Sequence, residues 1–287
     1  MFAESGVFVK LLLLIGLVLV GMVSFMLLGM LVVGVDMANN DTIRILQGFQ
    51  TIGAFILPPF VFTYLCNQNQ NNITSFLYLE KGKVKAIDLL YLALLMVMAI
   101  PFVNFLGGIN QNIQLPEWLS GLEEWMKAKE TQTEEITLRI VNVESIGILL
   151  LNILIIALLP AFGEELLFRS ALFRAFDSTK NKHLVVWLTA AIFSAIHLQF
   201  YGFLPRMLLG AGFGYMLLWT GSLYPAIIMH FVNNALIVIV YYLTYNNHIA
   251  LDLDNIGSDN TWWFGCISGI LTILGFLLFR KKFLDSE

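Results

Sequence analysis

The sequence alternates long runs of apolar residues with short polar connections. Eight runs approach or reach the length of helix that crosses about 30 Å of hydrocarbon. They lie at about 7–35, 46–66, 86–108, 146–168, 184–201, 203–221, 223–245 and 261–279. The pattern predicts an all-α, polytopic membrane protein of about eight transmembrane helices. We expect residues 1–287 to form a single integral membrane domain.

The connections between these runs alternate in charge. Basic residues follow the second, fourth and eighth runs, at 80–85, 174–182 and 280–282, whereas 109–145 and 246–260 are acidic. Basic loops stay in the cytoplasm. The charge pattern therefore predicts that both termini are cytoplasmic, and an even number of spans agrees with that.

Composition supports a membrane location and excludes some functions. Of the 287 residues, 58% are hydrophobic and 13% are charged, about half the usual charged share, and the net charge is −4. No basic patch indicates binding to nucleic acid. The lipid bilayer is the expected surrounding, and Cys66 and Cys266 are expected to pack as small apolar residues rather than form a disulfide.

The connection 109–145 is the one sizeable polar segment. Within it Trp118, Leu122 and Trp125 recur at helical spacing, with Glu123 and Lys127 on the other face. This pattern predicts an extracytoplasmic amphipathic segment that lies on the outer face of the membrane. A packed cap over the spans is an equally good interpretation.

The fourth run ends in charged residues that a membrane span rarely contains. A charge near the bilayer centre costs at least about 2.5–3.5 kcal/mol on insertion scales, so such residues usually face a protein interior or a cavity. Glu165 and Arg169 are four residues apart and share a helix face, so they can pair. Glu164 points about 100° away and remains free for another task. Pro160 is expected to bend this helix.

Three further polar residues lie within the later runs. His197 follows Phe193 by four residues in the fifth, and His230 and Asn234 share one face of the seventh. Counted from the cytoplasmic ends of their helices at 1.5 Å per residue, Glu164, His197 and His230 lie at depths of roughly 18, 20 and 12 Å. We expect them to meet in one pocket, reached from the cytoplasmic half.

Each of these residues alone has an ordinary structural explanation, such as an interhelical hydrogen bond or an ion pair. Together they supply what hydrolysis requires. Glu164 can act as general base toward a water that a histidine orients. A histidine and an asparagine can donate hydrogen bonds to a carbonyl oxygen as it becomes an oxyanion. Gly210 and Gly214, by contrast, indicate close helix packing.

The order Glu164-Glu165-x-x-x-Arg169, Phe193-x-x-x-His197, His230-x-x-x-Asn234 resembles the CPBP family. This family comprises CAAX proteases and bacteriocin-processing enzymes, also called Abi proteins, related to the Ras-converting CAAX endopeptidase. The resemblance covers about 155–240, the expected catalytic core region. It implies an intramembrane endopeptidase, acting on a membrane-associated protein or peptide, in a bacterial inner membrane.

Carried onto this chain, the resemblance implies that Glu164 and His197 activate water. His230 and Asn234 would hold the oxyanion, with Glu165 and Arg169 as support. It also implies a metalloprotease, in which Glu164, His197 and His230 are candidate ligands for zinc. The chain lacks the H-E-x-x-H pattern of membrane zinc proteases, so a metal-free, glutamate-dependent mechanism stays open.

Two other functions remain open from the sequence. A non-enzymatic membrane scaffold or immunity protein of the same fold would need no catalytic glutamate. A proton-coupled transporter would also use buried Glu and His residues, although no inverted repeat is visible.

Overall fold

The computed structural model describes residues 2–67, 72–82, 84–113, 115–249 and 255–284, and these ranges contain helices and turns but no strand. The predicted all-α, polytopic membrane fold is confirmed. Within these described ranges, six helical stretches are long and apolar enough to cross a membrane: Val7–Val33, Asn40–Cys66, Ala86–Gln111, Ile146–Ala175, Tyr224–Tyr245 and Asp259–Phe283.

The six stretches correspond to α1 (Val7–Val33), α2 with α3 (Asn40–Thr51 and Leu57–Cys66), α5 (Ala86–Gln111), α7 to α9, α12 (Tyr224–Tyr245) and α13 (Trp262–Leu284). π-helical turns join the pieces of two of them. In the second, η1 (Ile52–Ile56) lies between α2 and α3. In the fourth, α7 (Ile146–Asn152), η3 (Ile153–Leu158), α8 (Leu159–Glu165), η4 (Leu166–Ala171) and α9 (Leu172–Ala175) follow one another.

The other two predicted spans are shorter helices, so a count of eight spans is not confirmed. α11 (Phe203–Thr220) has 18 residues, whereas α10 (Lys182–Ala195) has only 14. The apolar run predicted a helix to residue 201, but the chain turns after Ala195. Leu198 adopts a left-handed φ of 53°, and a 3₁₀ turn, η5 (Phe200–Gly202), leads into α11. Apolarity continues through this turn, so it could not mark the helix end.

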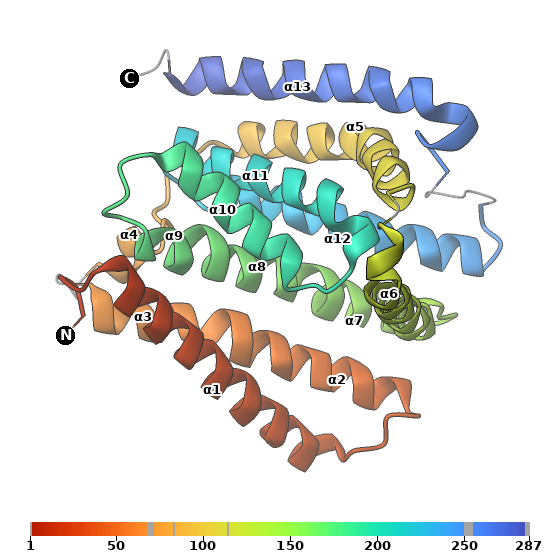
Figure 1. Cartoon of the computed structure of the whole chain (residues 1–287), viewed down its shortest axis with the longest axis horizontal. Helices are drawn as coiled ribbons and strands as arrows, with labels where there is room; N and C mark the ends of the chain where they lie inside the picture. The colour runs from red at the N-terminus through yellow and green to blue at the C-terminus, as the bar shows by residue number, and fades with distance from the viewer. Residues whose placement is uncertain (1, 68–71, 83, 114, 250–254, 285–287) are drawn as a thin grey trace.

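The long helices lie roughly side by side in a bundle (Figure 1). α13 packs mainly on α5, and α1 packs on α2, η1 and α3 on the opposite side. Between them lie α7 to α12. The backbone N–H of Phe2 donates to the carbonyl of Leu65, and Lys282 pairs with Asp88 at the start of α5. The start of α1 and the end of α13 lie at the same end of the bundle (Figure 1); that this end is cytoplasmic stays a prediction.

Glycines allow the central helices to approach closely, as the spacing of Gly210 and Gly214 predicted. A Cβ on Gly210 would lie 3.4 Å from the Cα of Ala190, and one on Gly214 would lie 3.0 Å from the side chain of Val186. α11 thus packs directly against α10. This contact holds the polar residues of the two helices at fixed positions.

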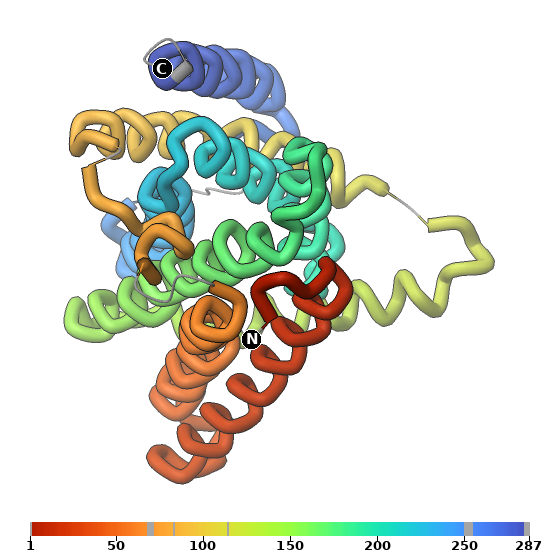
Figure 2. The backbone as a smooth tube through the Cα atoms, turned by 90° about the vertical axis from the view of Figure 1, so that its left-hand side faces the viewer, coloured from red at the N-terminus to blue at the C-terminus, as the bar shows by residue number. Residues whose placement is uncertain are grey.

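A helix in the connection 109–145 crosses the other end of the bundle. After the 3₁₀ turn η2 (Glu117–Leu119), α6 (Ser120–Val141) runs across the long helices and projects from the body in Figure 2. The helix is longer than the predicted amphipathic stretch. Trp118 is 81% exposed, whereas the Trp125 ring contacts Phe200 at 5.5 Å. The segment formed by η2 and α6 therefore has exposed apolar side chains, such as Trp118 and Leu122, and also a contact with the turn after α10.

Candidate active site

Glu164 and Glu165 lie at the end of α8, between two π-helical turns. The turn η3 precedes α8 and η4 follows it. Pro160, the second residue of α8, has no N–H for the helix ladder, which suits the first turn after such a break. π-helical turns inside α-helices occur frequently at functional sites. Both carboxylates are buried, Glu164 at 9% exposure and Glu165 at 0%.

Glu165 and Arg169 form a fully buried ion pair, as their spacing predicted. Arg169 Nη1 donates to Glu165 Oε1 at 2.8 Å, and both side chains are 0% exposed. Arg169 Nη2 donates to the carbonyl of Gly210 at 3.0 Å, and the guanidinium lies 4.4 Å from the ring centre of Phe193. Through these contacts the ion pair links its own helical stretch, α8 with η4, to α10 and α11, next to Glu164.

His230 lies on α12 and contacts both carboxylates. Its Nδ1 lies 2.8 Å from Glu165 Oε1, and its Nε2 lies 3.7 Å from Glu164 Oε2. The Glu165 carboxylate accepts this hydrogen bond in addition to the one from Arg169, so Nδ1 of His230 carries the proton. The ring stacks on Phe213 and meets Phe193 edge-on. Glu165 therefore fixes the orientation of His230.

His197 reaches the site from the turn after α10, not from within a span as the sequence predicted. Its Nδ1 lies 2.7 Å from the carbonyl oxygen of Phe193, which can only accept, so Nδ1 is the donor. Its Nε2 lies 3.9 Å from Glu164 Oε2. The buried ring of Phe193 contacts the rings of His197 and His230 and the guanidinium of Arg169. It therefore packs between these three side chains and restricts their orientation.

The two histidine Nε2 atoms thus face the same oxygen of Glu164, at 3.7 and 3.9 Å. These distances exceed those of a hydrogen bond. Polar atoms held just beyond contact distance in this way commonly share a bridging water. Glu164 and the two histidines come from three separate stretches of chain, and the structure brings them together as expected from the sequence.

Asn234 lies one helical turn from His230 on α12. Its side-chain oxygen accepts from Asn233 Nδ2 at 3.1 Å, which leaves its own amide N–H groups as donors. Within the described ranges no hydrogen bond joins Asn234 to Glu164, His197 or Glu165. Its expected part in an oxyanion site therefore stays a prediction.

Arg206 on α11 is a site neighbour that the sequence analysis did not single out. It interacts electrostatically with Glu164 and His197, and its guanidinium donates to the side chain of Gln199 at 2.7 Å. It also interacts with Glu130 of α6. An arginine within an apolar run was a usable signal, because such residues usually face a functional interior.

The metal prediction rests on Glu164, His197 and His230. Both histidines donate Nδ1 to an oxygen, as ligating histidines do, and two histidines with a carboxylate form a known zinc set. However, in the described chain no group of three or more His, Cys, Asp or Glu is arranged to hold an ion. Ligand atoms on tetrahedral zinc lie about 3.3 Å apart. The types of donor suit zinc, whereas the distances from the two histidine Nε2 atoms to Glu164 Oε2, 3.9 and 3.7 Å, are longer than that.

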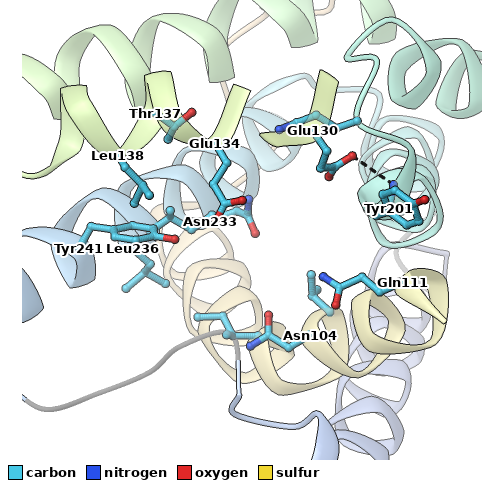
Figure 3. A pocket seen from close by; sticks show the side chains of 14 residues that line it. Asn104, Gln111, Glu130, Glu134, Thr137, Leu138, Tyr201, Asn233, Leu236 and Tyr241 are labelled. Carbon is cyan, nitrogen blue, oxygen red and sulfur yellow. Dashed lines mark hydrogen bonds between the residues drawn. The ribbon is translucent and has the colours of Figure 1, made fainter. Parts of the chain in front are cut away.

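A cavity of about 530 Å³ borders this site at the end of the bundle where α6 crosses (Figure 3). It lies between α5, α6, α12 and the turn before α11. Neither Glu164 nor the two histidines line it, but Gln199 and Asn233, which adjoin His197 and Asn234, do. We expected a pocket reached from the cytoplasmic half. This cavity instead lies at the end of the bundle opposite both termini. α6 and the turn before α11 form part of its wall.

Comparison with known proteins agrees with the motifs. Residues 146–236 match the family model described as type II CAAX prenyl endopeptidase Rce1-like. The matched region contains all seven named residues of the motifs. The chain matches none of the curated proteins and none of the solved structures with which it was compared. Residues 146–236 are therefore similar to the CAAX prenyl endopeptidase family, and the motifs lie within that part of the chain.

Proposed function

We propose that this protein is an intramembrane endopeptidase that hydrolyses a peptide bond with a water activated by Glu164. The observation that carries the proposal is the convergence of His197 Nε2 and His230 Nε2 on Glu164 Oε2, at 3.9 and 3.7 Å. A buried carboxylate whose Oε2 accepts no hydrogen bond within the described part of the chain, and which lies beside two oriented imidazoles, is suited to general base chemistry.

The proposed water lies between Glu164 and His197. It donates one hydrogen to Glu164 Oε2 and the other to His197 Nε2, whose lone pair is free because Nδ1 donates to Phe193. Its oxygen attacks the carbonyl carbon of the peptide bond as Glu164 takes the first proton. Glu164 then passes that proton to the departing amine, and the products are a carboxylic acid and an amine.

The proposed oxyanion site uses His230 and Asn234. The amide N–H of Asn234 donates to the developing oxyanion, and His230 donates through Nε2 when its ring is protonated. Glu165 accepts from the other side of that ring at 2.8 Å and stabilises its positive charge. Charge-oriented donors of this kind usually contribute the largest part of the rate enhancement.

The proposed substrate is a membrane-associated protein or peptide. The site lies between helices that are apolar enough to span a bilayer, so a soluble globular chain would have to unfold to reach it. The matching family is described as prenyl endopeptidases. A prenylated substrate is therefore one candidate within this class, and a bacterial inner membrane with cytoplasmic termini remains the predicted location.

The test compares protein termini in membranes from cells that express wild type or Glu164→Gln at equal abundance. New termini that require Glu164 would support the protease and identify its substrate. Glu124→Gln on the exposed face of α6 is a matched control and should leave those termini unchanged. If no terminus depends on Glu164, a non-enzymatic scaffold or immunity protein of this fold replaces the proposal.

The same comparison with a chelator addresses the metal. If zinc held by Glu164, His197 and His230 takes part, chelation removes the new termini and added zinc restores them. If Glu164 acts alone with water, the termini persist under chelation.

A further inference from the structure

His197 is carried by a turn, and little within the turn itself holds it in place. The backbone N–H of His197 donates to the carbonyl of Ser194 at 3.4 Å, which is long for a hydrogen bond. The next residue, Leu198, adopts a left-handed φ of 53°. This conformation is uncommon for residues other than glycine and persists only where the surroundings impose it. Contacts from outside the turn must therefore hold His197 beside Glu164.

Arg206 supplies two of these contacts. From the first turn of α11, its Nη2 donates to the side-chain oxygen of Gln199 at 2.7 Å, and its Nη1 donates to the backbone carbonyl of the same residue at 3.3 Å. Gln199 follows His197 by two residues. One guanidinium thus fixes both the backbone and the side chain at the end of the turn that carries His197.

The loop before α11 makes room for this guanidinium. A Cβ on Gly202 would lie 3.0 Å from Arg206 Nη2, so the lack of a side chain at this position allows the approach. Glu130 of α6 contacts the same loop, where its Oε2 accepts from the backbone N–H of Tyr201 at 3.3 Å, and its charge interacts with Arg206. The loop between α10 and α11 is therefore held by an arginine and a carboxylate that also attract each other.

We propose that Arg206 is a positioning residue for the hydrolysis, because it holds the turn in the place where His197 Nε2 faces Glu164. This inference rests on the proposed endopeptidase function and adds to it a residue outside the motifs. Arg206 interacts electrostatically with Glu164 and His197, but within the described part of the chain it makes no hydrogen bond or ion pair with either. It therefore acts through Gln199 and the turn, not by contact with the reacting atoms.

The two hydrogen bonds require an arginine rather than any cation. A guanidinium presents donors on its nitrogens in one rigid plane, whereas the lysine ammonium is a point charge on a flexible stem. Arg206→Lys keeps the positive charge but cannot reproduce the fixed pair of hydrogen bonds. Gln199→Ala keeps Arg206 and removes the shorter of the two bonds. Together these variants separate an effect of charge from an effect of position.

The first measurement reports on the His197 ring and does not require catalysis. Full-length protein with isotope-labelled histidine is placed in lipid nanodiscs, and the ring nitrogen signals of its four histidines are recorded by NMR and assigned with single His→Gln variants. The wild-type His197 signal should show one tautomer, with the proton on the Nδ1 that donates to Phe193. Arg206→Lys and Gln199→Ala should each shift or broaden that signal, because the turn no longer holds the ring in one place.

His230 provides an internal control in the same spectra. Its Nδ1 is held by Glu165 and not by the turn, so its signal should stay as in wild type. Arg139→Lys is the matched variant, because the exposed Arg139 also donates to backbone carbonyls of a connection, that between α1 and α2, and it should change neither signal. An unchanged His197 signal in Arg206→Lys, or His197 and His230 signals that change together, overturns the inference.

Cleavage kinetics measure the effect on the rate. The substrate is a synthetic peptide that spans a cleavage site identified from the termini that depend on Glu164. Arg206→Lys should lower kcat about 10²-fold with little change in KM, since a misplacement of about 1 Å costs that much. The double variant Arg206→Lys/Gln199→Ala should be no slower than Arg206→Lys, because both changes act on one contact. An unchanged kcat in Arg206→Lys, or losses that multiply in the double variant, overturns the inference.

The two measurements separate this inference from the proposed function. A His197 signal that changes as expected, in a protein without any cleavage that depends on Glu164, leaves Arg206 as the residue that positions His197 and removes the protease. Cleavage that depends on Glu164 but keeps its kcat in Arg206→Lys leaves the protease in place and removes the positioning role.

Discussion

The buried ion pair between Glu165 and Arg169 makes a quantitative prediction about stability. Arg169→Met removes the guanidinium and leaves Glu165 buried, with only the histidine as a partner. Both side chains are 0% exposed and their atoms lie 2.8 Å apart. Breaking a buried pair by removing one partner costs about 3–5 kcal/mol, because the remaining charge stays uncompensated.

The size of that loss separates a stranded charge from a lost hydrogen bond. A neutral hydrogen bond between helices in a membrane contributes about 0.6 kcal/mol on average. The double variant Glu165→Met/Arg169→Met leaves no unpaired charge, so it should be more stable than Arg169→Met alone. Pairs replaced by apolar residues of similar size are often neutral in stability.

The assay is reversible unfolding of the purified protein in mixed micelles, with the free energy of unfolding compared across the set. Glu123 and Lys127 provide a matched control, since they form an ion pair at 2.6 Å with the same four-residue spacing on the exposed α6. Lys127→Met should leave the unfolding free energy unchanged within error. The reasoning fails if Arg169→Met destabilises no more than Lys127→Met, or if the double variant loses the full sum of its two single variants.

Three further predictions test packing, catalysis and orientation. Gly210→Ala should lower cleavage activity strongly, because its Cβ would lie 2.8 Å from the buried guanidinium of Arg169. Gly212→Ala, whose Cβ would meet its nearest atom at 3.5 Å, should be tolerated. Initial cleavage rates and thermal stability of the two variants test this. Asn234→Ala should reduce kcat by about 10²–10³ with little change in KM, as loss of an oxyanion donor does; an unchanged kcat would remove that role. In a chain without its two native cysteines, Glu134→Cys should react with a membrane-impermeant maleimide in intact cells and Arg280→Cys only after permeabilisation; the reverse pattern would invert the predicted orientation.

The residues predicted correctly are those whose relation lies within one helix. The four-residue spacing of Glu165 and Arg169 defines a shared face wherever the helix is placed, and the structure shows that pair. The same periodicity separates Glu164 from Glu165. Helix geometry is local, so spacing alone sufficed, and the apolar runs likewise predicted the long spans.

The position of His197 could not be obtained in this way. The run Ile196-His197-Leu198-Gln199-Phe200 is as apolar as a helix end in lipid, yet the chain turns there and Leu198 adopts φ 53°. The turn depends on contacts made far along the sequence. Asn110 of α5 donates to the carbonyl of Phe200 and accepts from the backbone N–H of Leu204. No hydropathy pattern contains that pairing.

The same turn explains why the cavity lies where the sequence did not predict it. Depth counted along each helix treats the helices as parallel rods that start at a common plane, and it indicated a pocket open toward the chain ends. The short α10 brings its loop down toward Glu164, and α6 covers that loop through Trp125 and Glu130. A helix too short to span the bundle therefore leaves room at the α6 end, and that room lies beside the turn that carries His197.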